Sequence, residues 1–462
     1  MILVGILFYL FLTIAVGLWS AKRVHNSTDF LLASKRLGIG LSTATLFATW
    51  FGAETIIGAS SEMAEKGILG IIEDPLGAAL CLLLLGLFFA KPLYQMNLMT
   101  FGDFYRIQYN KTTEIIASIV LTISYFGWIA GQIVALGVIF HEFFQISQLT
   151  GTLVGTSIVL IYTYHGGMWS VAILDTIQNS VIVVGLLCIC IIIFPDLFHA
   201  KTVINLPTNY FQFFPEKDFL SWTQWFSSWF IIGLGSLPGQ DIFQRVMSSK
   251  DEKTAQRSAY LACFLYILVG SLPLIIATYI KVYQPQYIQA DETQNMLIKF
   301  VQSEMPAWVQ LLFVGALISA IMSTASGAIM APASIISENI YPYFCGNLSD
   351  QKLLKISRLS VLAVGILSFL LTLLNDRVFE LVGMSAAISG VSLFVPMVYG
   401  IYSPKSTPLG AILSIILGLI VYFLLKVTDS AYPDMFWGLF ASWLGMIIGN
   451  FFTKLKNNVM NS

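Results

Sequence analysis

The sequence predicts an all-α polytopic membrane protein with about 13 transmembrane helices, and three observations support this prediction. The chain of 462 residues is 57% hydrophobic and only 11% charged, whereas a typical soluble domain carries roughly 25% charged residues. Apolar runs of about 20 residues, the length that spans a bilayer, recur along the chain. The Lys and Arg residues between these runs gather on one side of the predicted membrane. A lipid bilayer is therefore the expected environment.

The predicted spans are the successive apolar runs of sufficient length. Gly or Ser interrupts the second and ninth runs, and the fifth run is short. The runs are 2–20, 38–60, 69–90, 113–141, 151–164, 171–195, 222–244, 257–281, 308–338, 357–374, 379–401, 408–425 and 432–453.

The distribution of basic residues predicts the orientation. If the N-terminus lies outside, 17 of the 24 Lys and Arg residues fall in inner loops, as the positive-inside rule requires. Lys22 and Arg23 directly follow the first run. The run is not followed by the small residues of a signal-peptide cleavage site. The first run is therefore a spanning helix rather than a signal peptide. We expect an integral protein of the plasma (inner) membrane with a cytoplasmic C-terminus.

Composition also excludes several functions. The net charge of −1 gives no electrostatic support for a nucleic-acid partner. Four of the five cysteines lie inside apolar runs, where Cys behaves as a small hydrophobic residue, so a metal or disulfide role is disfavoured. No Ser/His/Asp, metal or phosphate motif indicates an enzyme. The sequence leaves the oligomeric state open.

Residues 48–60 are the most polar stretch inside a predicted span. Glu54 and Thr55 stand between Gly52 and Gly58. Glycine lowers the cost of unwinding a helix, and an unwound stretch frees carbonyl oxygens that coordinate Na⁺. The alternative is a helix-packing face, since small residues let helices approach closely. Glu54 favours a functional site, because ionisable groups in spans are costly.

Residues 319–327 bring three hydroxyls together at Ser323, Thr324 and Ser326. Hydroxyl and carbonyl oxygens are the hard ligands that small alkali cations prefer. The alternative is that these hydroxyls bond back to the preceding turn of their own helix. The residues alone leave the two interpretations equal.

Residues 233–241 contain three glycines and Pro238, which together predict an interrupted helix. Interrupted helices near the midplane are the best sequence indication of a transporter binding site. The alternative is a simple proline kink. Gln240 and Asp241 directly follow the interruption and are candidate site residues.

Residues 162–178 predict two spans joined by a short cytoplasmic turn at Gly166 and Gly167. Asp175 and Gln178 are three positions apart and so share one helix face. An acid on the inner face of a span is a functional candidate.

These four segments together resemble the sodium:solute symporter family, and residues 162–178 are the most specific of them. Residues 29–38 and 100–104 are similar to loops of that family, and the resemblance covers about residues 20–345. Its most specific pattern is Tyr162-Thr163, Gly166-Gly167, Val171, Asp175 and Gln178. Within the family, residues 48–50, 87–92, 243–246 and 318–320 most resemble the high-affinity choline transporter branch.

The resemblance implies a fold of two inverted five-helix repeats of the leucine-transporter type. The repeats would be 38–195 and 222–401, which form a ten-helix transport core. Residues 1–37 would be a first helix and a cytoplasmic loop. Residues 402–462 would be two further helices and a short cytoplasmic tail.

The resemblance also implies one sodium site. Its ligands would be backbone carbonyls of the two matching helices together with two hydroxyls, and Asp175 would stand behind them as a second-shell charge. The implied ligands are the carbonyls of Ala48, Phe51 and Ala320 and the hydroxyls of Ser323 and Thr324.

The solute site is predicted between the interrupted helices and the span 113–141. Aromatic faces would cover the apolar part of the solute, amides would bond a polar part, and an acid would pair with an amine. The predicted residues are Trp50, Glu54, Thr55, Trp128, Gln132, Gln240 and Asp241. The chain departs from the choline branch at Gly239, where that branch has an aromatic residue, and at Ser326, where it has an acid.

The expected function is sodium-coupled symport of a small polar organic solute. The acids favour choline or a related amine. An amino acid such as proline is the alternative solute. A transporter-like membrane sensor that acts on a separate partner is the alternative function, and a passive channel fits the interrupted helices less well.

Overall fold

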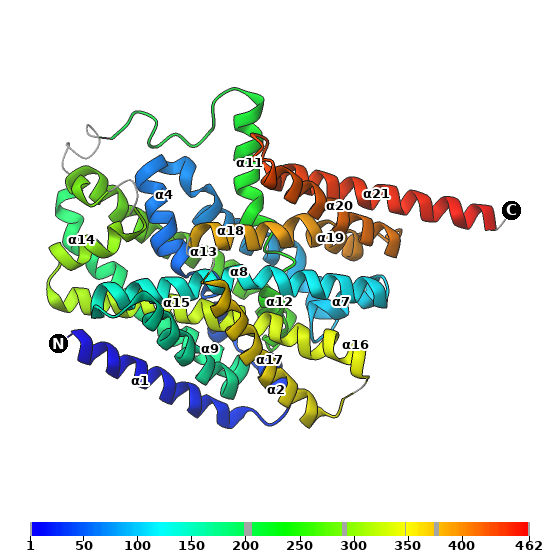
Figure 1. Ribbon diagram of the computed structural model, residues 1–462, viewed down its shortest axis with the longest axis horizontal. Helices are drawn as coiled ribbons and strands as arrows, with labels where there is room; N and C mark the ends of the chain where they lie inside the picture. The colour runs from blue at the N-terminus through cyan, green and yellow to red at the C-terminus, as the bar shows by residue number, and fades with distance from the viewer. Residues whose placement is uncertain (1, 198–205, 289–292, 347, 374–377, 461–462) are drawn as a thin grey trace.

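The computed structural model describes residues 2–197, 206–288, 293–346, 348–373 and 378–460 as a bundle of helices (Figure 1). The only β-type pairing among these residues is one isolated bridge between Leu37 and Ser249. The helices of the first half are α1 (Ile2–Ser20), α2 (Ser27–Leu32), α3 (Ile39–Phe47), α4 (Ala59–Lys66), α5 (Ala78–Leu84), α6 (Ala90–Gln95), α7 (Phe101–Gln108), α8 (Lys111–Phe144) and α9 (Gln148–Leu197). The helices of the second half are α11 (Phe219–Gly233), α12 (Gln240–Ser248), α13 (Glu252–Tyr283), α14 (Met296–Glu304), α15 (Ala307–Ile335), α16 (Tyr341–Cys345), α17 (Asp350–Leu371), α18 (Val378–Ser389), α19 (Val395–Tyr402), α20 (Pro408–Val427) and α21 (Asp434–Met460).

The described residues contain 10 helical stretches that are long and apolar enough to cross a membrane. The predicted number of about 13 is therefore not confirmed by this measure. The difference arises in three places. The predicted spans 38–60 and 222–244 are each broken into shorter helices, and the spans 151–164 and 171–195 are continuous within α9.

α9 reverses direction at Gly167, which adopts a positive φ of 50°. The Tyr162 hydroxyl donates to the Met322 carbonyl (2.8 Å), while Ser323 donates to the Asp175 carboxylate. A straight helix would separate positions 162 and 175 by about 20 Å, yet both contact adjacent residues of α15. The predicted turn is therefore present, and α9 forms two antiparallel arms.

Two helices are interrupted where the sequence predicts it. After α3 ends at Phe47, the chain runs through a non-helical stretch and resumes with a π-helical turn at Glu54–Gly58. Within the gap the Gly52 N–H donates to the Trp50 carbonyl (2.8 Å) instead of to a carbonyl four residues earlier. α11 and α12 are separated by 234–239, where Pro238 has no N–H to donate.

The bundle has a buried centre and exposed outer helices. α8 and α15 lie side by side through the centre, whereas α1 lies along one edge and the α20–α21 pair along another (Figure 1). In the apolar 18-residue stretch of 307–345, 94% of the residues are buried, against 33% for α20 and 28% for α1. The first interrupted segment contacts α8 through Gln132 and α15 through Thr324, so a site that it forms lies within the helix bundle.

Candidate functional site

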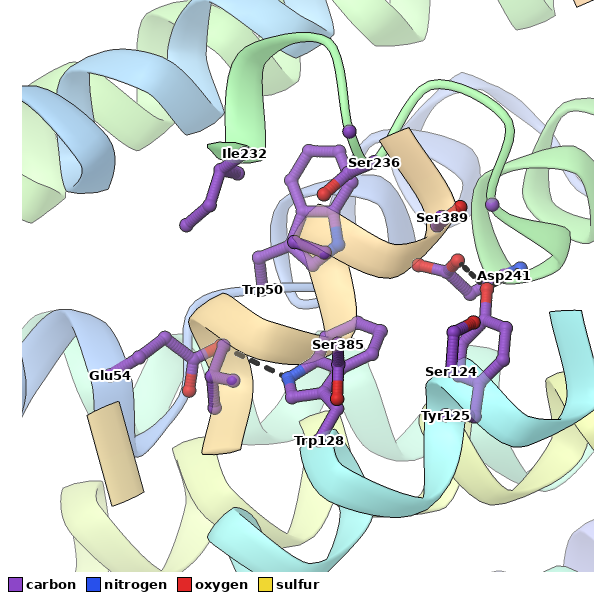
Figure 2. Close-up of a pocket in the computed structure, with 14 residues that line it drawn as sticks. Trp50, Glu54, Ser124, Tyr125, Trp128, Ile232, Ser236, Asp241, Ser385 and Ser389 are labelled. Atoms are coloured by element: carbon purple, nitrogen blue, oxygen red, sulfur yellow. Dashed lines mark hydrogen bonds between the residues drawn. The ribbon is translucent and has the colours of Figure 1, made fainter. Parts of the chain in front are cut away.

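A cavity lies where both interrupted helices meet α8 and α18 (Figure 2). Measured as space for the centres of water-sized spheres, it holds about 40 Å³, several times the 10–15 Å³ that one water needs. It is lined by Trp50, Glu54, Ser124, Tyr125, Trp128, Ile232, Gly235, Ser236, Gly239, Asp241, Val382, Ser385, Ala386 and Ser389.

Small residues bring α18 close enough to form one wall of the cavity. A Cβ added to Gly127 of α8 would lie 2.6 Å from the Ser385 hydroxyl. A Cβ added to Gly390 would lie 2.7 Å from the Cα of Gly235, between α11 and α12. Glycine at these positions therefore permits the close helix contacts, as small residues do in membrane bundles.

Glu54 is buried at one end of the cavity, where both of its carboxylate oxygens accept hydrogen bonds. The Trp128 indole N–H donates to Oε1 (3.4 Å), and the Gln132 amide donates to Oε2 (2.5 Å). The Gln132 Oε1 in turn accepts from the Ala53 N–H (3.2 Å) in the interrupted segment. Gln132 thus fixes Glu54 rather than lining the cavity.

Asp241 is buried at the other end and is held by Tyr125. The Tyr125 hydroxyl donates to Asp241 Oδ1 and accepts from the Asp241 backbone N–H (3.0 Å). The ring of Tyr125 stacks on Trp128, with centroids 5.8 Å apart and an angle of 30° between the planes. Together with Trp50, these rings place three aromatic residues between the two acids (Figure 2).

The titratable side chains of the cavity wall include two acids and no basic residue among those described. The acids are Glu54 and Asp241, and none of the described residues that line the wall is Lys, Arg or His. Aromatic faces and carboxylates together attract organic cations, the faces through their quadrupoles and the acids through charge. The arrangement is therefore suited to a small cation with apolar substituents.

Three residues predicted to bind the solute lie outside the cavity wall: Gln132, described above, and Thr55 and Gln240. Thr55 Oγ1 is 2.7 Å from the hydroxyl of Tyr266, which donates to Asp74 Oδ1 (2.9 Å). Gln240 Oε1 accepts from the Phe101 N–H (2.6 Å), and its amide donates to Ser334 (3.0 Å). Both groups of the Gln240 amide are therefore engaged away from the cavity. Trp50, Glu54, Trp128 and Asp241 do line the cavity.

The predicted sodium ligands lie near the same interruption. The Thr324 hydroxyl donates to the Ala48 carbonyl (3.2 Å). Phe51 lies within the interrupted stretch, and Ala320 lies one helical turn before Thr324 on α15. All five predicted residues are buried.

Asp175 stands directly behind these hydroxyls. It accepts from Ser323 on α15 and from Thr45 on α3 (2.6 Å). The Asp175 carboxylate therefore joins the second arm of α9, which follows Gly167, to both α3 and α15. Its second-shell role toward an ion, which the family resemblance implies, stays a prediction.

Arg245 is a buried cation that contacts the backbone of both Asp241 and Thr45, the residue whose hydroxyl donates to Asp175. Its Nε donates to the Thr45 carbonyl (2.8 Å), and its Nη1 donates to the Asp241 carbonyl (3.1 Å). A Cβ added to Gly327 would lie 2.2 Å from Nη2, so glycine there makes room for the guanidinium. Arg245 partly balances Asp241 and Asp175.

The α18 wall was not predicted from the sequence. Ser385 and Ser389 line the cavity, but they lie beyond residue 345, where the sequence motifs end. Two hydroxyls four positions apart in an apolar run share a helix face and could have indicated a polar lining. That pattern alone does not show which cavity the face borders.

The comparison with protein-family models matches residues 30–418 to the sodium:solute symporter family. The chain belongs to this family. Membership, together with the apolar helices, makes it an integral membrane protein of a transporter family, and the family description supports coupling to sodium.

Curated members of the family share about a quarter of the residues. The high-affinity choline transporter 1 of Drosophila melanogaster is 27% identical over 414 residues, which are 87% of this chain and 66% of that protein. The high affinity choline transporter 1 of Homo sapiens is 27% identical over 90% of this chain and 75% of its own length. The osmoregulated proline transporter OpuE of Bacillus subtilis is 23% identical over 90% of this chain and 87% of its own. The matched part of this chain therefore spans 66% and 75% of the length of these two choline transporters.

Solved structures share the fold. A Na⁺-coupled sialic acid symporter superposes with a TM-score of 0.84 at 19% identity, over 98% of this chain and 97% of that one. Mhp1, a nucleobase-cation-symport-1 family transporter, superposes with a TM-score of 0.58 at 16% identity, over 92% and 95%. The predicted leucine-transporter-type fold is thereby confirmed.

Proposed function

We propose that this symporter carries a small organic cation, choline or a related amine, into the cell together with Na⁺. The observation that carries the proposal is the cavity wall, where Glu54 and Asp241 flank the aromatic faces of Trp50, Tyr125 and Trp128. No basic side chain among the described lining residues would repel a cation there. The choline transporters among the curated relatives add support.

A sodium ion would bind between the interrupted segment and α15. Two oxygens that each lie about 2.4 Å from one cation, at right angles, are roughly 3.4 Å apart. The 3.2 Å between Thr324 Oγ1 and the Ala48 carbonyl oxygen supports this arrangement. Ser323 donates its hydrogen to Asp175, so its lone pairs are free for the ion. The carbonyls of Phe51 and Ala320 would complete the set.

Gly52 offers a physical link between ion and solute. A Cβ added there would lie 2.8 Å from the Thr324 hydroxyl, 2.7 Å from Gln132 Oε1 and 2.9 Å from Glu54 Oε2. Because these atoms are packed so closely, even a small shift of the interrupted segment on ion binding would also move the residues that hold Glu54. Such coupling is what symport by alternating access requires.

An amino acid such as proline is the second candidate solute, supported by the proline transporters among the relatives. Its carboxylate would need a donor or a basic group in the cavity. The two acids of the wall disfavour it. A sensor that acts on a separate partner would bind the same cation without uptake.

The proposal includes the setting of the protein. The protein would lie in the plasma (inner) membrane, with its N-terminus outside the cell and its C-terminus in the cytoplasm. Residues 38–401 would form the transport core. The repeats 38–195 and 222–401 each begin with an interrupted helix, which supports that division. Residues 1–37 and 402–462 would be peripheral.

Uptake by proteoliposomes, with and without an inward sodium gradient, tests the function. We expect labelled choline or a related amine to accumulate only with the gradient, and excess unlabelled amine to compete more strongly than proline or a hexose. Competition by proline or hexose without competition by amines would contradict the cation assignment. Binding without uptake would favour a sensor.

A further inference from the structure

Most polar groups of the cavity already have hydrogen-bond partners within the protein. Both oxygens of Glu54 accept hydrogen bonds, and the Tyr125 hydroxyl both donates to and accepts from Asp241. Ser385 donates to the Leu381 carbonyl (2.9 Å), and Ser124 donates to the preceding turn of its own helix. A solute would gain little by competing for these groups.

Two buried polar atoms of the same wall have no hydrogen-bond partner among the described residues. They are Asp241 Oδ2 and Ser389 Oγ, whose residues are 2% and 6% exposed. A buried carboxylate oxygen and a buried hydroxyl without partners are costly, and native proteins leave few of them. Unpaired atoms that face a cavity are therefore positions where a ligand supplies the missing partner.

The two residues come from segments that contact each other. Ser389 directly precedes Gly390, whose added Cβ would lie 2.7 Å from the Cα of Gly235, between α11 and α12. Asp241 lies two residues after the end of that same interruption, in the first turn of α12. In Figure 2 both lie on the side of the cavity opposite Glu54, with the aromatic rings between.

Gly239 gives Asp241 the room to face the cavity. A Cβ added to Gly239 would lie 2.5 Å from Asp241 Oδ1 and 3.2 Å from the Tyr125 hydroxyl. Any larger side chain at position 239 would therefore displace the carboxylate. The choline branch has an aromatic residue at the position of Gly239. Such a side chain and the present placement of Asp241 exclude each other.

We propose that Asp241 Oδ2 and Ser389 Oγ bind an N–H or O–H donor on the cationic solute, at the end of the cavity opposite Glu54. The inference rests on the proposed function and adds the chemistry of the solute: a cation that carries a hydrogen-bond donor. A site with unpaired buried acceptors discriminates against an analogue that lacks the donor, because binding the analogue leaves those acceptors unpaired.

The test is a binding measurement with ligands that differ in the donor alone. Tryptophan fluorescence of the purified protein, in saturating Na⁺, reports binding of choline, its O-methyl ether and tetramethylammonium. Choline has one O–H donor, whereas the other two have none, and tetramethylammonium is smaller, which controls for steric exclusion. We expect choline to bind about tenfold more tightly than either.

Four variants assign the preference to the two atoms. Ser389→Ala and Asp241→Asn should each reduce the ratio between choline and tetramethylammonium to about twofold or less. Ser385→Ala removes a hydroxyl one turn earlier on α18 that already has a partner, and it should keep the ratio. Ser368→Ala removes a buried hydroxyl that has no partner among the described residues, from α17, which contributes no residue to the cavity lining, and it should bind like the unmodified protein.

The outcomes separate this inference from the proposed function. Equal binding of all three cations, or an unchanged ratio in both Ser389→Ala and Asp241→Asn, overturns the donor subsite while the cation transporter stands. Absence of binding by any organic cation overturns the proposed function and the subsite with it.

Discussion

Thr324 and Ala48 bring a hydroxyl and a carbonyl oxygen to 3.2 Å through a direct hydrogen bond. The hydrogen bond holds the two oxygens near the spacing that a small cation requires. An ion would therefore take the place of this hydrogen bond, and the Thr324 hydroxyl would keep its hydrogen and turn it away from the Ala48 carbonyl. Ser323 is held at the same time by Asp175. Little rearrangement would be needed to bind Na⁺, which favours affinity.

Thr324→Ala tests the sodium site at the scale of one residue. Removing one oxygen ligand should raise the half-saturating Na⁺ concentration for uptake by about tenfold, equivalent to roughly 1.4 kcal/mol. Thr324→Ser keeps the oxygen and should stay close to the unmodified protein. If Ser323→Ala combined with Thr324→Ala leaves the sodium dependence unchanged, the ion binds elsewhere.

Arg245 has an equally local role. It is almost fully buried, and two of its nitrogens donate to carbonyls of α3 and α12. A buried charge without neighbouring opposite charge is strongly destabilising, and Asp241 and Asp175 supply that charge. Arg245 therefore lets both acids stay in the protein interior, between the proposed solute and ion sites.

At the scale of the element, the turn within α9 depends on a single glycine. Gly167 adopts a φ of 50°, and a Cβ there would lie 2.4 Å from the Phe30 carbonyl oxygen. The turn places Tyr162 and Asp175 on opposite arms that both contact α15. The geometry of the proposed ion site thus depends on a residue that does not touch it.

Gly167→Ala should lower the thermal unfolding temperature in detergent by several degrees, because strain at such a position costs about 1–3 kcal/mol. Gly315→Ala is the matched control. It lies in α15, where the nearest atom to an added Cβ is 3.6 Å away, on Val181. Equal unfolding temperatures for the two variants would show that position 167 tolerates a side chain.

At the scale of the whole molecule, orientation decides which way the solute moves. The excess of Lys and Arg in alternate loops predicts that the segment between α16 and α17 is cytoplasmic. Cys345 ends α16 there, and it is the exposed one among the free cysteines of the described residues.

A membrane-impermeant maleimide should therefore label Cys345 in inside-out vesicles and leave it unlabelled in right-side-out vesicles. Cys345→Ser removes the labelled site and identifies any background from other cysteines. Labelling from the outside only would reverse the predicted orientation of every span.

Much of the molecule follows from local sequence. The share of charged residues requires a bilayer, and apolar length locates the helices. Gly52 and Pro238 mark the interruptions because one lowers the cost of unwinding and the other lacks an N–H. These effects act within a few residues of the chain, so they are visible without any tertiary contact.

The composition of the cavity is a different matter, because it depends on how distant helices approach one another. Gln240 and Asp241 are neighbours in sequence, yet one side chain turns to Phe101 and Ser334 and the other to Tyr125. Successive residues of a helix point about 100° apart, so the face that borders a cavity is set only when its neighbours are in place. Ser389 joins the wall for the same reason, since the contact between Gly235 and Gly390 brings α18 against the interruption, and no pattern within α18 could specify that partner.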